Sequence, residues 1–102
     1  MVVKVRLRKI TIIAERLLRD QLLDLLKRHG ASGWTIAAVE GEGSRGVRAS
    51  EWEGRNVQID TLVSPEISGA IMKEIGELYF EDWAIIVYAS DVDVLRGGKY
   101  IP

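Results

Sequence analysis

The chain has 102 residues, 47% hydrophobic and 28% charged, a balance that predicts one soluble globular domain over 1–102. Its formal net charge of −1 argues against non-specific binding to DNA or to anionic membranes, which depends on excess lysine and arginine. Because the sequence has no cysteine and a single histidine, it excludes disulfides, thiol nucleophiles and histidine-rich metal centres. No apolar run reaches the roughly 20 residues that span a bilayer, so we expect a cytoplasmic protein.

The first predicted elements are a strand and a helix. Apolar and basic side chains alternate over residues 3–8, which predicts a strand that continues through 10–13. Leucines at helical spacing then predict a helix over 15–29, with Glu15 in its first turn and Gly30 as its stop. The basic residues of the strand are expected to share one solvated face: Lys4, Arg6, Arg8 and Lys9.

The middle of the chain predicts two more strands, over residues 34–39 and 56–63. Between them lies a polar stretch with several glycines, in which we expect a flexible loop over about 42–55. Period-two alternation places one set of side chains of the later strand on a single face: Val57, Ile59, Thr61 and Val63.

The last third of the chain predicts a helix and a strand. Ser64 supplies a capping hydroxyl and Pro65 a first-turn proline, so a helix is expected from there to about Tyr79. A fourth strand is expected over 83–89, with a short polar segment after Ser90. The helix residues expected to face inward are Ile67, Ala70, Ile71, Ile75 and Leu78.

The resulting βαββαβ order predicts the α+β, ferredoxin-like sandwich, in which both helices cover one face of the sheet. Apolar residues also occur on the other face. A second layer is therefore needed there, and association into a trimer would supply it.

One segment carries the residues best suited to binding an anion. Gly41 and Gly43 let backbone N–H groups approach an anion closely, and Ser44 adds a hydroxyl. Arg45 and Arg48 lie three residues apart and could both form forked hydrogen bonds to one phosphate or carboxylate. The pattern is not a P-loop, since no Gly-Lys-Ser/Thr opens a helix. On these residues alone, an exposed hairpin loop with solvated arginines remains the simpler interpretation.

Three segments together resemble a known family. They are residues 30–35 (Gly-Ala-Ser-Gly-Trp-Thr), 41–48 (Gly-Glu-Gly-Ser-Arg followed by Arg48) and 79–88, the last leading on to residues 94–100. Their order and spacing resemble the PII superfamily, and most closely its PII-like branch of SbtB and the carboxysome-associated PII proteins. The resemblance covers essentially the whole chain after the first few residues.

The resemblance implies a homotrimer that binds adenine nucleotides in the clefts between subunits and has no enzymatic cofactor or catalysis of its own. The ligands implied are AMP, ADP, ATP or cyclic AMP, with bicarbonate as a further ligand and a bicarbonate transporter or other membrane protein as partner. Binding would order the loop over 42–55, the T-loop, and so regulate inorganic-carbon uptake. The implied residues for base and ribose are Gly33, Trp34, Thr35, Val87, Tyr88 and Ala89, and those for the phosphates are Gly41, Gly43, Ser44, Arg45 and Arg48, with Arg96 or Lys99 from a neighbouring subunit.

The sequence also departs from patterns of this superfamily. Glu81 and Asp82 stand where the nitrogen-control members carry a phosphate loop rich in glycine and lysine, so triphosphate should be held less well. The loop over 42–55 has no tyrosine, so uridylylation is not expected. Some SbtB proteins carry a redox switch on a cysteine-bearing extension, and because this sequence has no cysteine, that switch is not expected.

Three other functions fit the sequence less well. An RNA-binding module can share this fold, but it stacks bases on aromatic residues of its central strands, and residues 56–63 contain none. A small enzyme would need a nucleophile or an acid–base pair in a cleft, and the sequence offers no convincing set. A trimeric metal-tolerance protein of the CutA type is disfavoured by the lack of cysteine and of clustered histidine.

Overall fold

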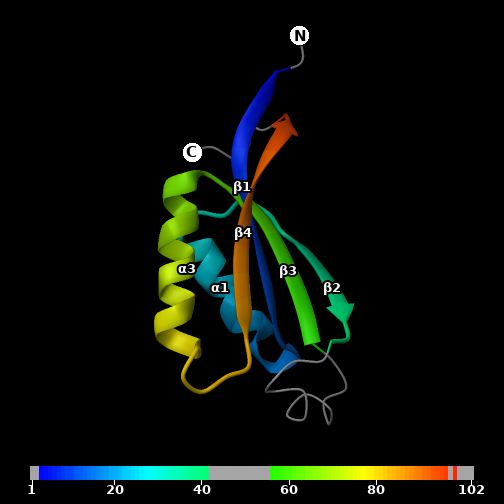
Figure 1. Ribbon diagram of the computed structural model, residues 1–102, viewed down its shortest axis with the longest axis vertical. Helices are drawn as coiled ribbons and strands as arrows, with labels where there is room; N and C mark the ends of the chain where they lie inside the picture. Colours follow the sequence, from blue (N-terminus) through cyan, green and yellow to red (C-terminus); the bar gives the residue numbers. More distant parts are fainter. Residues whose placement is uncertain (1–2, 42–55, 97, 99–102) are drawn as a thin grey trace.

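The computed structural model describes residues 3–41, 56–96 and 98. Four strands form one antiparallel sheet in the order β2-β3-β1-β4, and two helices cover one of its faces (Figure 1). The α+β, ferredoxin-like βαββαβ architecture is thereby confirmed. The elements are β1 (Lys4–Glu15), the 3₁₀ turn η1 (Arg16–Leu18), α1 (Arg19–Arg28), β2 (Thr35–Val39), β3 (Asn56–Val63), α3 (Pro65–Tyr79) and β4 (Ile86–Leu95).

The core lies between the helices and the facing side of the sheet. The predicted face of β3 points into it, because Val57, Ile59, Thr61 and Val63 are all buried. A central row of the ladder runs through Ile36, Ile59, Ile12 and Val87, in register across the four strands. The helices close this layer with a set of side chains that are all fully buried: Leu18, Leu22, Leu25, Leu26, Ile71 and Ile75.

The opposite face of the sheet, called the open face below, is not covered by any helix of the described residues (Figure 1). Strand alternation brings polar side chains of β3 to this face, together with apolar and aromatic residues from β4. Ile86 is 54% exposed and Tyr88 is 48% exposed there. An exposed apolar area beside a polar rim is typical of a surface that meets another molecule.

The first helix begins later than its leucine pattern suggested. Glu15 does not lie in a first helical turn: it is the last residue of β1, pairs with Asn56 and is 5% exposed. The turn η1 then leads into α1 at Arg19. The predicted stop is confirmed, because Gly30 has a φ of +92°, a conformation that favours glycine.

The fourth strand was placed wrongly at both ends. It begins at Ile86 rather than at residue 83, because Trp83 and Ile85 pack against the core outside the ladder. It also continues to Leu95, although the segment after Ser90 was expected to be short and polar. Asp91 and Asp93 look like loop residues in the sequence, but the strand accommodates them through cross-strand ion pairs.

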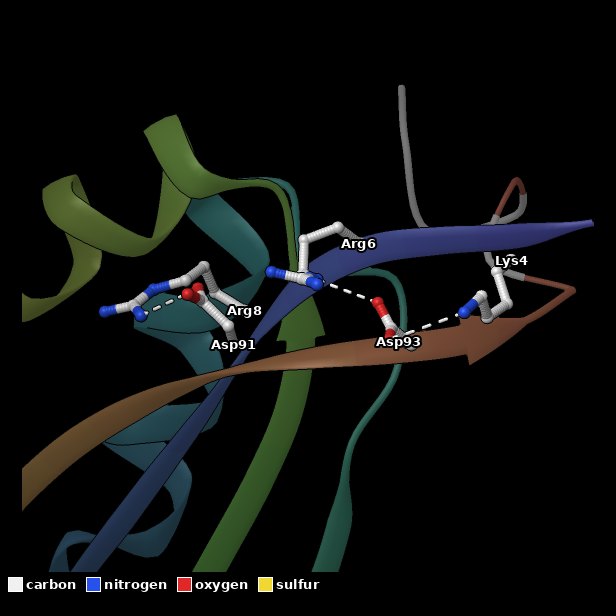
Figure 2. A network of polar contacts seen from close by, with 5 residues as sticks. All are labelled: Lys4, Arg6, Arg8, Asp91 and Asp93. Atoms are coloured by element: carbon white, nitrogen blue, oxygen red, sulfur yellow. Dashed lines mark hydrogen bonds and ion pairs between the residues drawn. The ribbon is translucent and has the colours of Figure 1, made fainter.

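These ion pairs lie where β1 and β4 extend beyond the helices (Figures 1 and 2). Arg8 donates to Asp91 at 3.0 Å and Arg6 donates to Asp93 at 2.8 Å, with Lys4 4.0 Å from the same carboxylate. The hydrogen bond from Arg6 and its charge lower the pKa of the Asp93 carboxyl. The three basic residues therefore form a charge-paired face rather than a freely solvated one.

Lys9 does not share that face. It pairs in register with Leu62 and Ser90 and so points to the open face, where it is partly buried. Strand alternation makes this unavoidable, because residues 8 and 9 point to opposite sides.

Helix α3 has the predicted bounds but differs in detail. Its buried residues are Ser68, Ile71, Ile75 and Tyr79, spaced by three or four. Ala70 and Leu78 lie to the side of that stripe and are exposed, so their predicted inward orientation is wrong. The Ser64 hydroxyl makes no capping bond, so the predicted side-chain cap is not formed. The Ser64 carbonyl accepts from the Ser68 N–H at 3.0 Å, which is the first hydrogen bond of the helix. No helix in the described part of the chain has the length and apolar character needed to cross a bilayer.

The two helices are joined by a carboxylate. Glu74 on α3 accepts a hydrogen bond from Arg28 at 2.9 Å, and its second oxygen lies 2.5 Å from His29 Nε2 at the end of α1. The hydrogen bond from Arg28, followed by that from His29, lowers the pKa of Glu74 below its ordinary value of 4.5. The ionised Glu74 carboxylate therefore stabilises the fold fully above the pKa that Glu74 has in the unfolded chain. This stabilisation is lost as the pH falls through the lower pKa that Glu74 has in the folded protein.

This link predicts a specific acid sensitivity. Between about pH 5 and about pH 3, the unfolding temperature of the wild type should fall more than that of Glu74→Gln, which has no carboxyl at this position to titrate. The two unfolding temperatures should differ at neutral pH and converge at low pH, as measured by thermal denaturation followed by circular dichroism. If the difference between the two unfolding temperatures is the same at every pH, ionisation of Glu74 does not stabilise the fold.

Candidate functional site

The first group of predicted site residues lies where the chain enters β2. Thr61 Oγ1 donates to the carbonyl of Gly33 at 2.6 Å, and Trp34 packs against the core with the Lys27 ammonium 5.7 Å from its ring centroid. Thr35 begins the strand on the open face and is exposed. A short segment at the edge of the sheet is therefore held from its inner side, with Thr35 reaching solvent.

The second group lies on β4, at the opposite edge of the sheet. Val87 and Ala89 point to the helices and pack against the core, so only their backbone can meet a ligand. Tyr88 lies between them on the open face and is 48% exposed. Its phenol is the side chain of this group that is available for contact.

A single row of the ladder joins the two groups. Thr35 is opposite Asp60, Asp60 is opposite Thr11, and Thr11 is opposite Tyr88. Two strands therefore separate Thr35 from Tyr88, a span of about 14 Å at roughly 4.8 Å per strand. Because the two groups occupy opposite edges, one chain does not bring them into a single small-molecule site. They can line one cleft only if they come from two copies of the chain.

The predicted phosphate residues are described only in part. Gly41 is exposed just after β2, at the end of the sheet where β4 begins. Arg96 is exposed at the other end of β4, about 30 Å away along the strand, with a φ of 64°. It is not brought near Gly41 within one chain. The remaining predicted residues, Gly43, Ser44, Arg45, Arg48 and Lys99, lie outside the described residues, as does the proposed loop over 42–55.

Sequence reasoning missed a polar cluster in the middle of the open face. Asp60 accepts a hydrogen bond from Thr11 Oγ1 at 2.6 Å and another from Gln58 Nε2 at 3.1 Å. Both carboxylate oxygens are therefore satisfied within the chain. The alternation of polar residues along 56–60 placed Asp60 and Gln58 on one face, but the contact with Thr11 required the register between β1 and β3.

The described residues contain no group of three metal-ligating side chains. The buried Tyr79 has a raised pKa because burial disfavours the phenolate, and its hydroxyl donates to Gln21 at 3.2 Å. It joins α3 to α1 inside the helical layer and faces neither predicted group.

The fold is that of a small ferredoxin-like α+β protein, and the two predicted groups lie on opposite edges of its sheet. Residues 7–99 match the family of the nitrogen regulatory protein P-II. The chain belongs to the P-II family.

Three solved structures illustrate the similarity. A protein from Thermus thermophilus, described as PII-like and signalling, is 45% identical over 95% of this chain and 97% of its own, with a TM-score of 0.84. CPII from Thiomonas intermedia, bound to ADP, AMP and acetate, is 25% identical over 98% and 99% of the two chains, with a TM-score of 0.82. A second CPII structure, bound to ADP, AMP and bicarbonate, is 27% identical over 90% and 96%, with a TM-score of 0.76.

Proposed function

We propose that the protein is a PII-like signal-transduction protein that binds adenine nucleotides, AMP or ADP foremost, between two copies of the chain. The observation that supports this most directly is the placement of the two predicted groups at opposite edges of one sheet. A structural relative binds ADP and AMP, which supports the class of ligand. In this proposal, one copy supplies Gly33, Trp34 and Thr35, while the neighbouring copy supplies the edge around Tyr88.

The proposed assembly is a homotrimer, which is typical of P-II proteins. Ile86 and Tyr88 are about half exposed on the open face, which supports association through that side of the sheet. Thr11 and Gln58 already donate to both oxygens of Asp60, so neither oxygen would need a hydrogen-bond donor from another copy.

The proposed regulation depends on residues outside the described part of the chain. Phosphate groups would meet Gly41, Gly43, Ser44, Arg45 and Arg48, which orders the T-loop over 42–55 and changes the surface offered to a partner. Arg96 or Lys99 of a neighbouring copy would complete the site. The described base of this loop, Gly41 and Asn56, lies at the same end of the sheet as the start of β4.

We further propose that this chain belongs to the SbtB and carboxysome-associated branch and acts in the cytoplasm on inorganic-carbon uptake through a bicarbonate transporter. Bicarbonate is the second ligand in this scheme, and its presence in a relative's structure supports that choice. Catalysis and an enzymatic cofactor have no part in the scheme. RNA binding is disfavoured because the central strands, β1 and β3, contain no aromatic residue on which a base could stack.

Titration calorimetry with AMP, ADP, ATP and cyclic AMP tests the proposal, and Gly33→Ala sharpens it. Among the described residues other than its two neighbours, none comes within 4 Å of a Cβ at Gly33, and the φ of Gly33 is not positive, so the variant should fold like the wild type. If Gly33 lies against the nucleoside, the added methyl should weaken ADP binding about tenfold or more.

Gly69→Ala is the matched control, because a Cβ there also meets nothing within 4 Å. Gly69 is exposed in the interior of α3, where alanine should stabilise the fold by up to about 1 kcal/mol. The change should leave nucleotide binding unchanged. The proposed function is wrong if the wild type binds none of the four nucleotides at about 1 mM, an affinity too weak for sensing.

A further inference from the structure

Thr61 carries a hydroxyl into a layer that is otherwise apolar. It is 3% exposed on the helix-facing side of β3, between Ile59 and Val63, and its partner on β1 is Ile10. A valine would have the same shape, and a buried hydroxyl is unfavourable unless it is hydrogen-bonded. The Thr61 hydroxyl is satisfied because it donates to the carbonyl of Gly33 at 2.6 Å. This hydrogen bond links the core to the edge of the sheet.

The Gly33 carbonyl belongs to a segment with few other ties. The backbone N–H groups of Gly30 and Ala31 bond back to α1 at 3.0 Å, and the pairing of β2 with β3 begins at Thr35. Among the described contacts, Thr61 is the hydrogen-bond partner that holds the stretch between Ala31 and Thr35. Trp34 would be opposite Thr61 if the pairing of β2 with β3 continued by one residue. The hydrogen bond from the Thr61 side chain therefore holds the chain at the point where backbone pairing ends.

The outer side of this segment is open. In the described part of the chain, a Cβ at Gly33 would meet nothing within 4 Å apart from its sequence neighbours, and β2 is an edge strand with backbone groups that point away from β3. Backbone C=O and N–H groups match the amino donor and the ring-nitrogen acceptor of adenine. Such recognition requires a backbone held still before the ligand arrives.

We propose that Thr61 is a positioning residue for the adenine end of the nucleotide, acting through the Gly33 carbonyl without touching the ligand. This inference rests on the nucleotide binding proposed above. In the free protein, Thr61 fixes the path of residues 32–34 and so presents their outer backbone groups in the geometry that the base requires. Loss of the hydroxyl lets the segment move and lowers the affinity for every ligand that contains adenine by a similar factor.

The test compares Thr61→Val, which keeps the shape without the hydroxyl, with Thr61→Ser, which keeps the hydroxyl. Thr61→Val should raise the dissociation constants of ADP and AMP by about tenfold each, with Thr61→Ser within about threefold of the wild type. Hydrogen exchange of the Trp34 and Thr35 amides in the free protein should be faster in Thr61→Val than in Thr61→Ser. Should Thr61→Val not fold, the pair Thr61→Ser and Thr61→Ala makes the same comparison, because these variants differ only in Oγ.

The outcomes separate this inference from the function on which it rests. If the wild type binds no adenine nucleotide, both are overturned. If the wild type binds ADP and Thr61→Val binds it equally well, the positioning role alone is overturned, and the same holds if exchange at Trp34 and Thr35 is unchanged. A lower unfolding temperature with unaltered nucleotide affinity would assign Thr61 a purely structural role.

Discussion

Ile86→Arg is expected to convert the assembled protein into folded monomers that no longer bind nucleotide. Ile86 is 54% exposed on the open face at the start of β4, so the change should cost the isolated chain little stability. In the proposed trimer, the same position is covered by another copy, where a buried unpaired charge is strongly destabilising. Sedimentation velocity should therefore show one third of the wild-type mass, and titration with ADP should show no binding.

Leu78→Arg provides the control for that experiment. Leu78 is 53% exposed, nearly the same as Ile86, but it lies on α3 in the layer on the other side of the sheet. This variant should keep the wild-type mass and nucleotide affinity. If Ile86→Arg also keeps the wild-type mass, the open face is not the assembly surface, and the proposed cleft between copies loses its basis.

Ile59→Ala is expected to remove a large part of the free energy of unfolding. Ile59 is fully buried in the central row of the sheet, between Ile36 and Ile12. Truncation of a buried isoleucine to alanine costs about 2–5 kcal/mol, against a total of about 5–15 kcal/mol for a typical domain. Urea denaturation at one fixed protein concentration should show the loss, since assembly makes stability depend on concentration.

Ile59→Val separates packing from other effects of the change. It removes one methylene from the same place and should cost only about 0.5–1.5 kcal/mol. A loss equal to that of Ile59→Ala would mean that the site does not behave as a close-packed core position. Neither variant should alter ADP affinity where the protein remains folded, because Ile59 points away from the open face.

The period of the apolar residues predicted most of the fold. Residues 56–63 alternate cleanly, and the structure gives β3 those same bounds. The end of β4 was missed because of contacts distant in sequence: Asp91 and Asp93 continue the strand, and Arg8 and Arg6 lie opposite them. No local rule could supply those partners.

Less of the candidate site could be predicted from the sequence alone. Residues 33–35 and 87–89 were named through resemblance to a family, and their separation onto opposite edges became visible only with the strand order. The role of Thr61 was hidden for a related reason. Its place in the apolar alternation assigned it to the core, whereas its hydroxyl reaches Gly33, 28 positions earlier in the chain.

The location of the two half-sites on opposite edges has a consequence for mixtures of damaged chains. In the proposed ring, every cleft takes its β2 edge from one chain and its β4 edge from the next. A chain impaired only around residues 33–35 and a chain impaired only around Tyr88 would each fail alone. Assembled together, the two kinds of chain would form some intact clefts and so complement each other. A protein whose binding site lies within a single chain cannot show this complementation.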